Sequence, residues 1–339
     1  RMKLRIPTLN TTVWAAIAVA VVFVGVFLFW IFRGTSITVV NEQPSGPLSP
    51  LTGLPCAGAH RRPIAIMLAS DPEARPLSGI SQADMVFEMP VTPNGITRIM
   101  AVYQCSDPQE IGSVRSARQD FIPLAQGVDA IFAHWGGEHD ALAELDARVV
   151  DNVDALKYEG STFYRKQGIP RPHNGFTTLP LIRERADQLG YRASTSLPAY
   201  THITGKVERN LGTIADSATV PWLQGMDVRF SYDEASNAYL RWRGGTPEID
   251  TTNREQARAS VVIIMKTASS FLRDQYISVT TTGSGVATIW QGGRSISALW
   301  KKPTATAMLA FTDSQGKAIP LEPGTIWVLI DTPLPAVTQ

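Results

Sequence analysis

An uncharged apolar run near the start of the chain, residues 13–32 (VWAAIAVAVVFVGVFLFWIF), limits the folds open to this sequence more than any other feature. Its 20 residues match the length that an α-helix needs to cross the hydrocarbon core of a bilayer. Trp14 and Trp30 lie near its two ends, where indole rings favour the lipid headgroups. We therefore predict a transmembrane helix over residues 13–32.

Basic residues set the expected orientation of this helix. Arg1, Lys3 and Arg5 precede the run, whereas Arg33 alone follows it immediately. By the positive-inside rule, residues 1–12 form a cytoplasmic tail and the bulk of the chain is extracytoplasmic. A cleaved signal peptide is the alternative, but its apolar core is usually only about 7–15 residues long and ends at a small-residue cleavage site. We therefore expect an uncleaved signal anchor in the cell membrane.

The two cysteines, Cys56 and Cys105, both follow the apolar run. An oxidising compartment permits a disulfide between them. Their spacing does not show whether the two Cα atoms approach closely enough, so two unrelated small buried residues remain the alternative. Cys56 lies beyond a polar segment rather than at the end of the apolar run, which argues against a lipid anchor on this residue.

Short apolar runs and helix-like segments alternate between residues 61 and 200, after a linker over residues 33–60 that is rich in Pro, Ser, Thr and Gly. Continuous apolar runs predict buried strands, and amphipathic spacing predicts helices. The expected strands are residues 63–69, 84–89, 96–104 and 129–135, and the expected helices are residues 117–126, 138–148 and 179–189. Strands interleaved with helices favour an α/β layered domain over residues 61–200.

After about residue 200, β-type runs follow one another with turn residues between them. Gly292 and Gly293 separate two of these runs and predict a β-hairpin. The expected strands are residues 228–232, 239–242, 260–266, 276–281, 286–290, 295–300, 307–311 and 326–330. The predicted fold class is therefore an α/β (α+β) layered N-terminal domain with a mostly β C-terminal domain over residues 201–335.

The charge balance of the chain is nearly neutral. Lys and Arg number 31 and Asp and Glu number 30, for a net charge of +1. Proteins that bind nucleic acid normally show a basic domain or a basic face, so we expect no nucleic-acid partner. Any positive patch must then be local.

Arg115 and Arg118 form such a local patch just before a predicted helix. Ser116 with Gln119 three residues later is typical of a capping box, which starts a helix. A helix start attracts anions through its unpaired N–H groups, and guanidinium groups match carboxylate and phosphate geometry. The residues therefore predict an anion site. The alternative is that the arginines clamp loop carboxylates, for which Asp84, Glu88, Asp107, Glu110 and Asp120 are the candidates nearby in sequence.

A second strand-to-helix turn has similar character. The predicted strand that ends at His134 continues through Gly136 and Gly137 into a helix at Glu138. Open α/β sheets place ligands beyond the carboxyl ends of their strands, so the two turns are expected to share one crevice. Arg98 lies in an otherwise apolar strand, where a charged side chain needs a partner or an exposed edge.

Polar residues in a turn-rich stretch offer further candidates. His173 and Asn174 contact the ligand in one interpretation and hydrogen-bond their own loop in the other.

The spacing of His134 and His139 does not match the i, i+4 zinc helix, and no cysteine cluster accompanies them, so we expect no metal and no cofactor.

Catalysis is the alternative function. His134 is the candidate general base, with Ser113 or Ser116 as nucleophile or Glu88 assisting, because such groups need only meet in space. No Gly-x-Ser-x-Gly elbow surrounds either serine. We therefore expect binding rather than catalysis, with an enzyme of this kind as the second hypothesis.

Several short motifs, taken together and in order, resemble the YerB-like lipoproteins, a bacterial cell-surface family of two domains of unknown function. They are residues 50–54 (PLTGL), 62–67 (RPIAIM), 74–84 (ARPLSGISQAD), 95–98 (GITR), 111–118 (IGSVRSAR), 133–137 (AHWGG), 172–174 (PHN), 283–287 (GSGVA) and 323–327 (PGTIW). The resemblance covers roughly residues 50–332 and implies a two-domain extracytoplasmic protein of a Gram-positive-type envelope. It implies no catalytic residues. It departs from the family at the anchor, since the named members are lipidated.

Together with this resemblance, the sequence predicts a membrane-anchored binding or scaffold protein at the bacterial cell wall; the alternative is a cell-wall hydrolase or transferase with His134 as general base. Its expected ligand is anionic or carboxylate-bearing, such as a peptidoglycan fragment, or else an acidic segment of a cell-wall synthesis protein. The expected ligand-binding residues are Arg98, Arg115, Ser116, Arg118, His134, His173 and Asn174.

Overall fold

The computed structural model describes residue 10 and residues 46–204, 212–222, 226–273 and 275–335. The chain divides into two compact units, residues 1–43 and 44–339. The predicted transmembrane helix over residues 13–32 lies outside the described residues. Within the described part, no helix combines the length and the apolar character needed to cross a bilayer.

The described residues form a mixed α/β fold in which strands dominate and helices are few. Its centre is an 11-stranded sheet with the order β20-β19-β18-β15-β21-β2-β3-β1-β5-β6, and β9 pairs beside β19. These strands are β1 (Ile64–Ala69), β2 (Met85–Pro90), β3 (Thr97–Tyr103), β5 (Ile131–His134), β6 (Asn152–Asp154), β9 (Thr213–Ile214), β15 (Val261–Lys266), β18 (Gly283–Gln291), β19 (Arg294–Lys302), β20 (Ala310–Thr312) and β21 (Ile326–Asp331).

The two halves of the chain meet inside this sheet. Strand β2 from the first half pairs in parallel with β21 from the second, with Met85 opposite Ile326. Every residue of β1, β2 and β3 is buried, as expected for strands covered on both faces. The change of sequence texture near residue 200 is therefore not a break in the main sheet.

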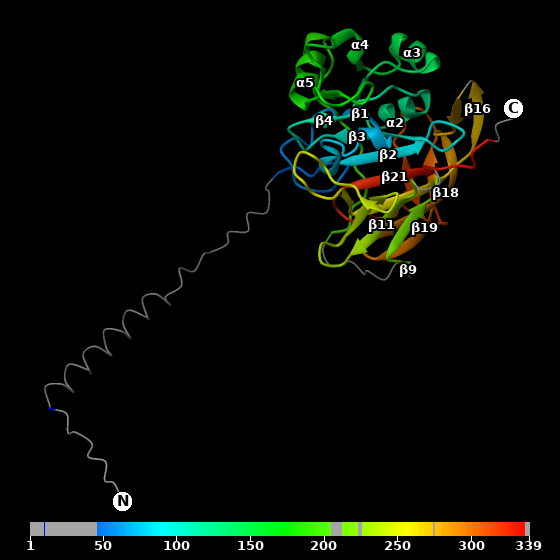
Figure 1. Ribbon diagram of the computed structural model, residues 1–339. Helices are drawn as coiled ribbons and strands as arrows, with labels where there is room; N and C mark the ends of the chain where they lie inside the picture. Colours follow the sequence, from blue (N-terminus) through cyan, green and yellow to red (C-terminus); the bar gives the residue numbers. More distant parts are fainter. Residues whose placement is uncertain (1–9, 11–45, 205–211, 223–225, 274, 336–339) are drawn as a thin grey trace, which may run out of the picture. The chain divides into compact units, whose positions relative to one another are not determined.

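Two apolar cores cover the two faces of the sheet. Ala65 and Met67 of β1 belong to one core together with α2 (Ile122–Gly127) and α3 (His139–Asp146). Ile64 and Ile66 belong to the other, together with α5 (Leu179–Gln188) and a five-stranded sheet. Figure 1 shows α3, α4 (Ala155–Tyr158) and α5 together at one end of the molecule, with β9, β11 and β19 toward the other.

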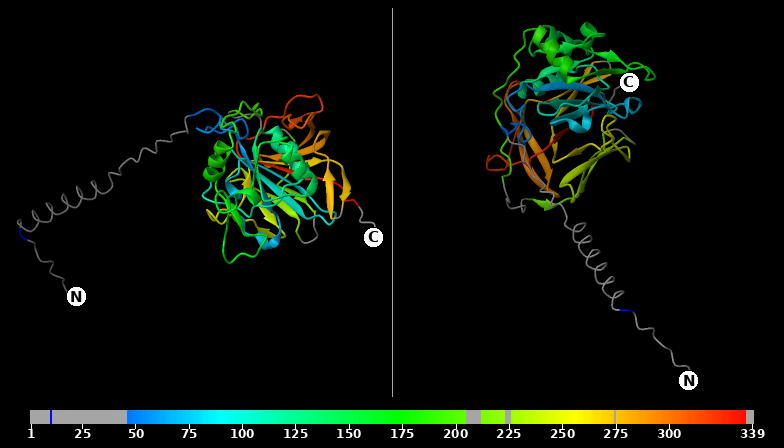
Figure 2. Two further views of the ribbon diagram at one scale, coloured as in Figure 1. Left: turned by 90° about the horizontal axis from the view of Figure 1, so that it is seen from above. Right: turned by 90° about the vertical axis from the view of Figure 1, so that its left-hand side faces the viewer.

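Three smaller sheets complete the fold. They are the five-stranded sheet of β10 (Ser217–Val220), β11 (Val228–Asp233), β12 (Ala238–Arg243), β13 (Thr246–Pro247) and β14 (Arg258–Ala259), the hairpin of β16 (Ser269–Arg273) and β17 (Tyr276–Val279), and the sheet of β4 (Ile111–Gly112), β8 (Gly175–Thr177) and β7 (Tyr164–Arg165). In the right-hand view of Figure 2 the cyan strands of the first half lie between the green helices and the later yellow and orange strands.

Most of the predicted elements are present, and the helix ends follow from local residues. Helix α5 begins at the Thr178 N-cap and ends before Gly190, whose φ of 74° suits a glycine. Gly292 and Gly293, with φ of 56° and 71°, make the predicted hairpin turn between β18 and β19. Short 3-10 helices cover residues Pro72–Ala74, Ile80–Gln82 and Gln119–Phe121.

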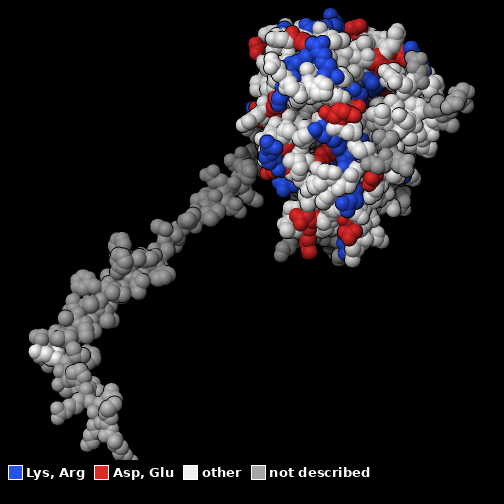
Figure 3. Space-filling model, in the orientation of Figure 1, with Lys and Arg blue, Asp and Glu red and all other residues white. Residues whose placement is uncertain are grey.

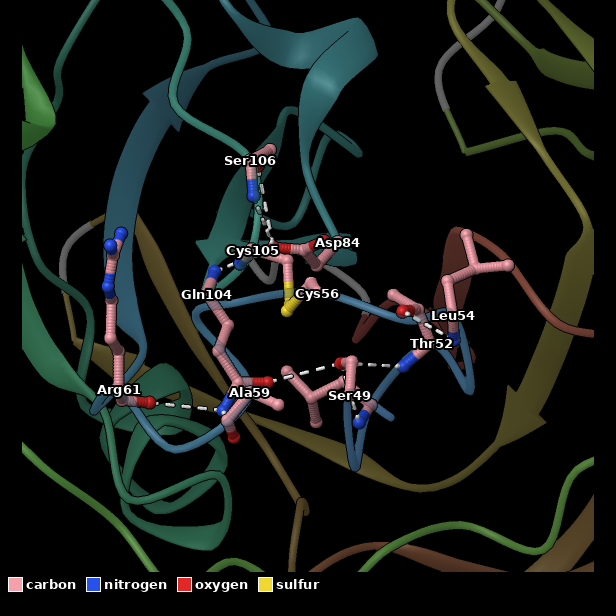
Figure 4. The surroundings of a disulfide bond; sticks show 11 residues. Ser49, Thr52, Leu54, Cys56, Ala59, Arg61, Asp84, Gln104, Cys105 and Ser106 are labelled. Atoms are coloured by element: carbon pink, nitrogen blue, oxygen red, sulfur yellow. Dashed lines mark hydrogen bonds between the residues drawn. A yellow bond between two sulfur atoms is a disulfide. The ribbon is translucent and has the colours of Figure 1, made fainter. Parts of the chain in front are cut away.

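Residues 46–60, which we placed in a linker, are instead part of the folded unit. Leu51 is fully buried in the first core. Cys56 and Cys105 form a disulfide with a Cα–Cα distance of 5.9 Å (Figure 4). Ser49 donates a hydrogen bond to the Gln104 side chain over 3.2 Å, and the Asp84 carboxylate accepts the N–H of Gln104 over 2.6 Å (Figure 4). These contacts fasten the entry segment to the end of β3.

Candidate functional site

The two predicted strand-to-helix turns run side by side. The Arg115 N–H donates to the Met67 carbonyl over 2.8 Å, and the Trp135 N–H donates to the Arg115 carbonyl over 3.0 Å. The Ala117 N–H then donates to the Gly136 carbonyl over 2.9 Å. Residues 115–117 therefore lie between β1 and the turn after β5, which makes the two predicted turns neighbours.

The helix start at the first turn differs from the prediction. The helix begins at Gln119 rather than near Ser116, its N-cap is Arg118, and no side chain caps it from that position. The predicted capping box between Ser116 and Gln119 is therefore wrong. Glu138 accepts the Gln119 N–H over 2.9 Å and also caps the start of α3. Because a carboxylate already occupies this N–H group, Ser116 does not mark an anion site.

Three arginines lie at the edge of these turns, and two of them contact a single carboxylate, Asp71. Arg98 Nη1 lies 3.1 Å from Asp71 Oδ2, and Arg115 Nε lies 3.7 Å from the same oxygen. Arg98 pairs with Ala69 in the sheet, and Asp71 follows two residues later, which explains why the two side chains meet. We call Arg98, Arg115, Arg118 and Asp71 the arginine corner.

The arginine corner carries more positive than negative charge. Burial, helped by Arg115 and Arg118 and opposed by Asp71, lowers the pKa of Arg98 to about 10. Burial also lowers the pKa of Arg118, against the opposing influence of Tyr276 and Glu138. The Nε atoms of all three arginines are buried without a hydrogen-bond partner. Within the described residues, the corner thus has donors and charge that its own acceptors do not satisfy.

A hairpin from the second half of the chain forms one wall of the corner. The Arg118 guanidinium lies 4.8 Å from the centre of the Tyr276 ring on β17. Asp120 accepts the Val279 N–H over 2.8 Å, and Arg273 bonds Asp140 of α3 over 2.6 Å. Neither Tyr276 nor Asp71 is evident from the sequence, because neither lies within a recognisable motif and both reach the corner through the tertiary fold.

The carboxylates expected to clamp the arginines are bound elsewhere. None of the five has a contact with Arg115 or Arg118 among the hydrogen bonds and ion pairs of the described residues. Asp84 binds the backbone after β3, Glu88 binds Arg241 and Arg243, Asp107 binds Arg183, Glu110 binds Lys166, and Asp120 binds the β17 backbone. Among the described carboxylates, Asp71 is therefore the one that supports the alternative in which a loop carboxylate holds Arg115.

His173 and Asn174 have different surroundings. Burial and the nearby Arg115 guanidinium lower the pKa of His173, and its Nδ1 atom is buried without a partner. His173 thus lies within electrostatic range of the corner. Asn174 accepts a hydrogen bond from Arg165 over 2.8 Å, and that guanidinium stacks 4.1 Å from the centre of the Trp135 ring. Asn174 therefore holds its own loop.

His134 is a core residue rather than a contact of the corner. Its side chain is 1% exposed, its Nδ1 lies 2.8 Å from the Gly136 carbonyl and its Nε2 lies 3.3 Å from Asn152. Burial lowers its pKa, while Asp154 opposes that shift. Both ring nitrogens are engaged, so His134 has no nitrogen free for a ligand or for general-base catalysis.

The other catalytic candidates have similar limits. Glu88 is fully buried and ion-paired, and Ser116 has no hydrogen bond to another side chain of the described part.

The described residues contain no group of three or more His, Cys, Asp or Glu side chains that is placed to hold a metal ion.

Comparisons with known proteins identify similar chains. The model of the N-terminal domain of DUF3048, a protein of unknown function, matches residues 51–192, and the model of its C-terminal domain matches residues 218–328. The putative lipoprotein YerB of Bacillus subtilis (strain 168) is 30% identical over 309 residues, which cover 86% of this chain and 88% of that protein. The crystal structure of the Bacillus subtilis YerB protein has a TM-score of 0.76 and 27% identity, and the match covers 85% of this chain and 97% of that one.

Proposed function

The chain belongs to the YerB-like family, defined by the two DUF3048 domains, and on that premise we propose that it is a membrane-anchored, extracytoplasmic binding protein of the bacterial envelope. The relative's name as a putative lipoprotein supports attachment to a membrane. The disulfide between Cys56 and Cys105 supports an oxidising compartment. In this chain the apolar run of residues 13–32 would be the anchor in place of a lipid.

The binding site in this proposal is the arginine corner. The observation that carries it is that Arg98 and Arg115 share one carboxylate, Asp71, while the Arg118 guanidinium is close enough to add its positive charge to theirs. An incoming carboxylate would supply the missing negative charge, and the planar guanidinium groups match its two oxygens. The Tyr276 ring beside Arg118 offers an apolar surface to the rest of the ligand.

A carboxylate-bearing peptidoglycan fragment is the ligand that we propose. Such fragments combine free carboxylates with sugar and short peptide parts, and they are present where an extracytoplasmic anchor would hold this chain. The near-neutral net charge of +1 argues against a polyanionic partner, and Figure 3 shows basic and acidic side chains interspersed on the face drawn.

Thermal stabilisation of the full chain by defined muropeptides tests the proposal. A ligand that binds the native state raises the unfolding temperature, and the rise grows with the ratio of ligand concentration to Kd. We expect muropeptides with free carboxylates to stabilise the protein, and the same muropeptides with amidated carboxylates to do so much less. Arg115→Gln should weaken binding at least tenfold.

Arg258→Gln is the matched control, because Arg258 is an exposed arginine of β14 with a side chain 54% exposed. Unchanged binding in Arg115→Gln would refute the role of the corner. Stabilisation by acidic peptides but not by muropeptides would assign the site to a protein partner. Release of new fragments during the incubation would replace binding by hydrolysis.

A further inference from the structure

A pocket lies between the two halves of the chain, and no residue of the arginine corner lines it. It encloses about 420 Å³, within the range of small-molecule sites. The turn after the first 3-10 helix forms one side, and the connection from β12 through β13 forms the other. Its apolar lining consists of Pro72, Pro76, Met226, Pro247 and Ile249.

Three charged side chains also line this pocket. Arg75 belongs to the first half of the chain, whereas Arg243 and Glu248 belong to the second. Arg243 and Glu248 are almost completely buried, at 4% exposure each. Arg75 Nη1 lies 3.8 Å from Glu248 Oε1, and Arg75 Nη2 donates to the Ser70 carbonyl over 3.0 Å. The polar wall is therefore built from fixed groups rather than from mobile surface side chains.

A buried ion-pair network lies behind this wall. Glu88 accepts hydrogen bonds from Arg241 over 2.6 Å and from Arg243, and Arg241 Nε donates to Glu248 over 2.5 Å. Together with Arg75, the network holds three guanidinium groups against two carboxylates. Burial alone would raise the pKa of Glu88, but Arg241 and Arg243 outweigh it and hold the pKa below the usual range. Within the part of the chain that the structure describes, one positive charge in the network is left without a counter-ion.

Unsatisfied atoms of the network occur on the residues that line the pocket. Within the described residues, the Nε atoms of Arg75 and Arg243 are buried without hydrogen-bond partners, and Glu248 Oε1 is buried without a hydrogen-bond donor. Buried donors without acceptors are costly, and charged donors more so. Burial lowers the pKa of Arg75, with Glu248 opposing and Arg243 and Arg241 adding to the shift. Excess positive charge and free donors therefore coincide at one pocket.

We propose that this pocket binds a small carboxylate that carries an apolar substituent, with the carboxylate at Arg75 and Arg243 and the substituent against the proline-rich lining. The carboxylate neutralises the excess charge of the network and accepts from its unpartnered donors. A free aliphatic acid and the C-terminal residue of a peptide both supply this group. The site is separate from the arginine corner, so this inference does not depend on the proposed function.

Calorimetric titration of the full chain tests the pocket with four probes. These are 4-methylpentanoate, 4-methylpentanamide, and the peptide acetyl-Ala-Leu with a free or an amidated C-terminus. We expect the two carboxylates to bind and the two amides to bind at least tenfold more weakly. Stronger binding of the free acid or of the peptide identifies which source the pocket prefers.

Variants locate the binding. Arg75→Gln should weaken carboxylate binding at least tenfold, whereas Arg258→Gln should change it less than twofold. Thr246→Trp fills the pocket from an exposed position of its rim and should abolish binding while the network stays intact. Equal binding of acids and amides, absence of binding, or loss of binding in Arg115→Gln but not in Arg75→Gln or Thr246→Trp would overturn the proposal.

Discussion

Thr97 and Arg98 are neighbours in β3, yet their side chains enter two different charged clusters. Thr97 donates to Glu88 over 2.6 Å and accepts from Arg243 over 3.0 Å, whereas Arg98 bonds Asp71 over 3.1 Å. Successive residues of a strand point to opposite faces of a sheet, which explains the separation. The strand thus carries the buried ion-pair network on one face and the arginine corner on the other.

Glu88→Gln should destabilise the protein strongly. Removal of the carboxylate charge leaves Arg241 and Arg243 buried with too little negative charge, and breaking a buried ion pair typically costs about 3–5 kcal/mol. Urea unfolding followed by tryptophan fluorescence measures the change in the free energy of unfolding. The matched control is Glu255→Gln, which removes an exposed contact of 4.0 Å with Arg258 and should cost under about 1 kcal/mol. Equal effects of the two changes would contradict a structural role for the network.

Asp120 should make stability depend on pH. Burial raises its pKa to about 7, while hydrogen bonds from Val279 and Ser278 lower it and Glu138 and Glu144 raise it. The folded state therefore holds a proton that the unfolded chain, with a carboxyl pKa near 3.8, releases. This contribution to the free energy of unfolding is complete below about pH 4 and is lost as the pH rises through 7, at up to about 1.4 kcal/mol per pH unit.

Asp120→Asn tests this dependence, because an amide keeps an acceptor for the Val279 N–H and cannot ionise. Denaturant unfolding between pH 4 and 8 should show a smaller loss of stability in the variant than in the wild type, with the variant the more stable above pH 7. Asp187→Asn, at an exposed helical position, should leave the profile of the wild type unchanged. A variant profile parallel to that of the wild type would show that Asp120 titrates normally.

The disulfide should contribute measurably to stability. Cys56 and Cys105 are 49 residues apart, so the bond restricts a long loop of the unfolded chain, an effect typically worth about 2–4 kcal/mol. The double variant Cys56→Ser, Cys105→Ser should lower the unfolding temperature, and a reducing agent should lower that of the wild type by a similar amount. The reducing agent should have no effect on the double variant. An unchanged unfolding temperature in all three cases would mean that the bond does not form.

The sequence predicts the strands of this fold better than their partners. Strand β1 is evident from the sequence because its six consecutive residues are all apolar, and all six are buried in the structure. The parallel pairing of β2 with β21 joins segments more than two hundred residues apart, and no local pattern specifies it. His134 shows the same limit, since a polar residue at the end of an apolar strand has the same sequence signature in a core as in a site.

The arginine corner contains some residues that can be predicted from the sequence and others that cannot. Arg98, Arg115 and Arg118 were predicted together because a charged residue in an apolar strand and two arginines in one turn are visible locally. Tyr276 was missed because the contact with Arg118 depends on a hairpin that folds back from the second half of the chain. Glu138 replaced the expected Ser116 cap because two turns, distant in sequence, pack side by side.

Asp71→Asn should tighten the binding of anions at the arginine corner. Asp71 is the carboxylate that Arg98 and Arg115 share, so it competes with any anionic ligand for the same donors. An amide of the same shape keeps the turn and removes the competing charge. We expect the affinity for carboxylate-bearing muropeptides to rise several-fold, measured by calorimetry at low salt, and the gain to shrink as salt screens the charges. Asp187→Asn removes one negative charge at an exposed position and controls for net charge. Weaker binding in Asp71→Asn would mean that Asp71 positions the arginines for the ligand rather than competing with it.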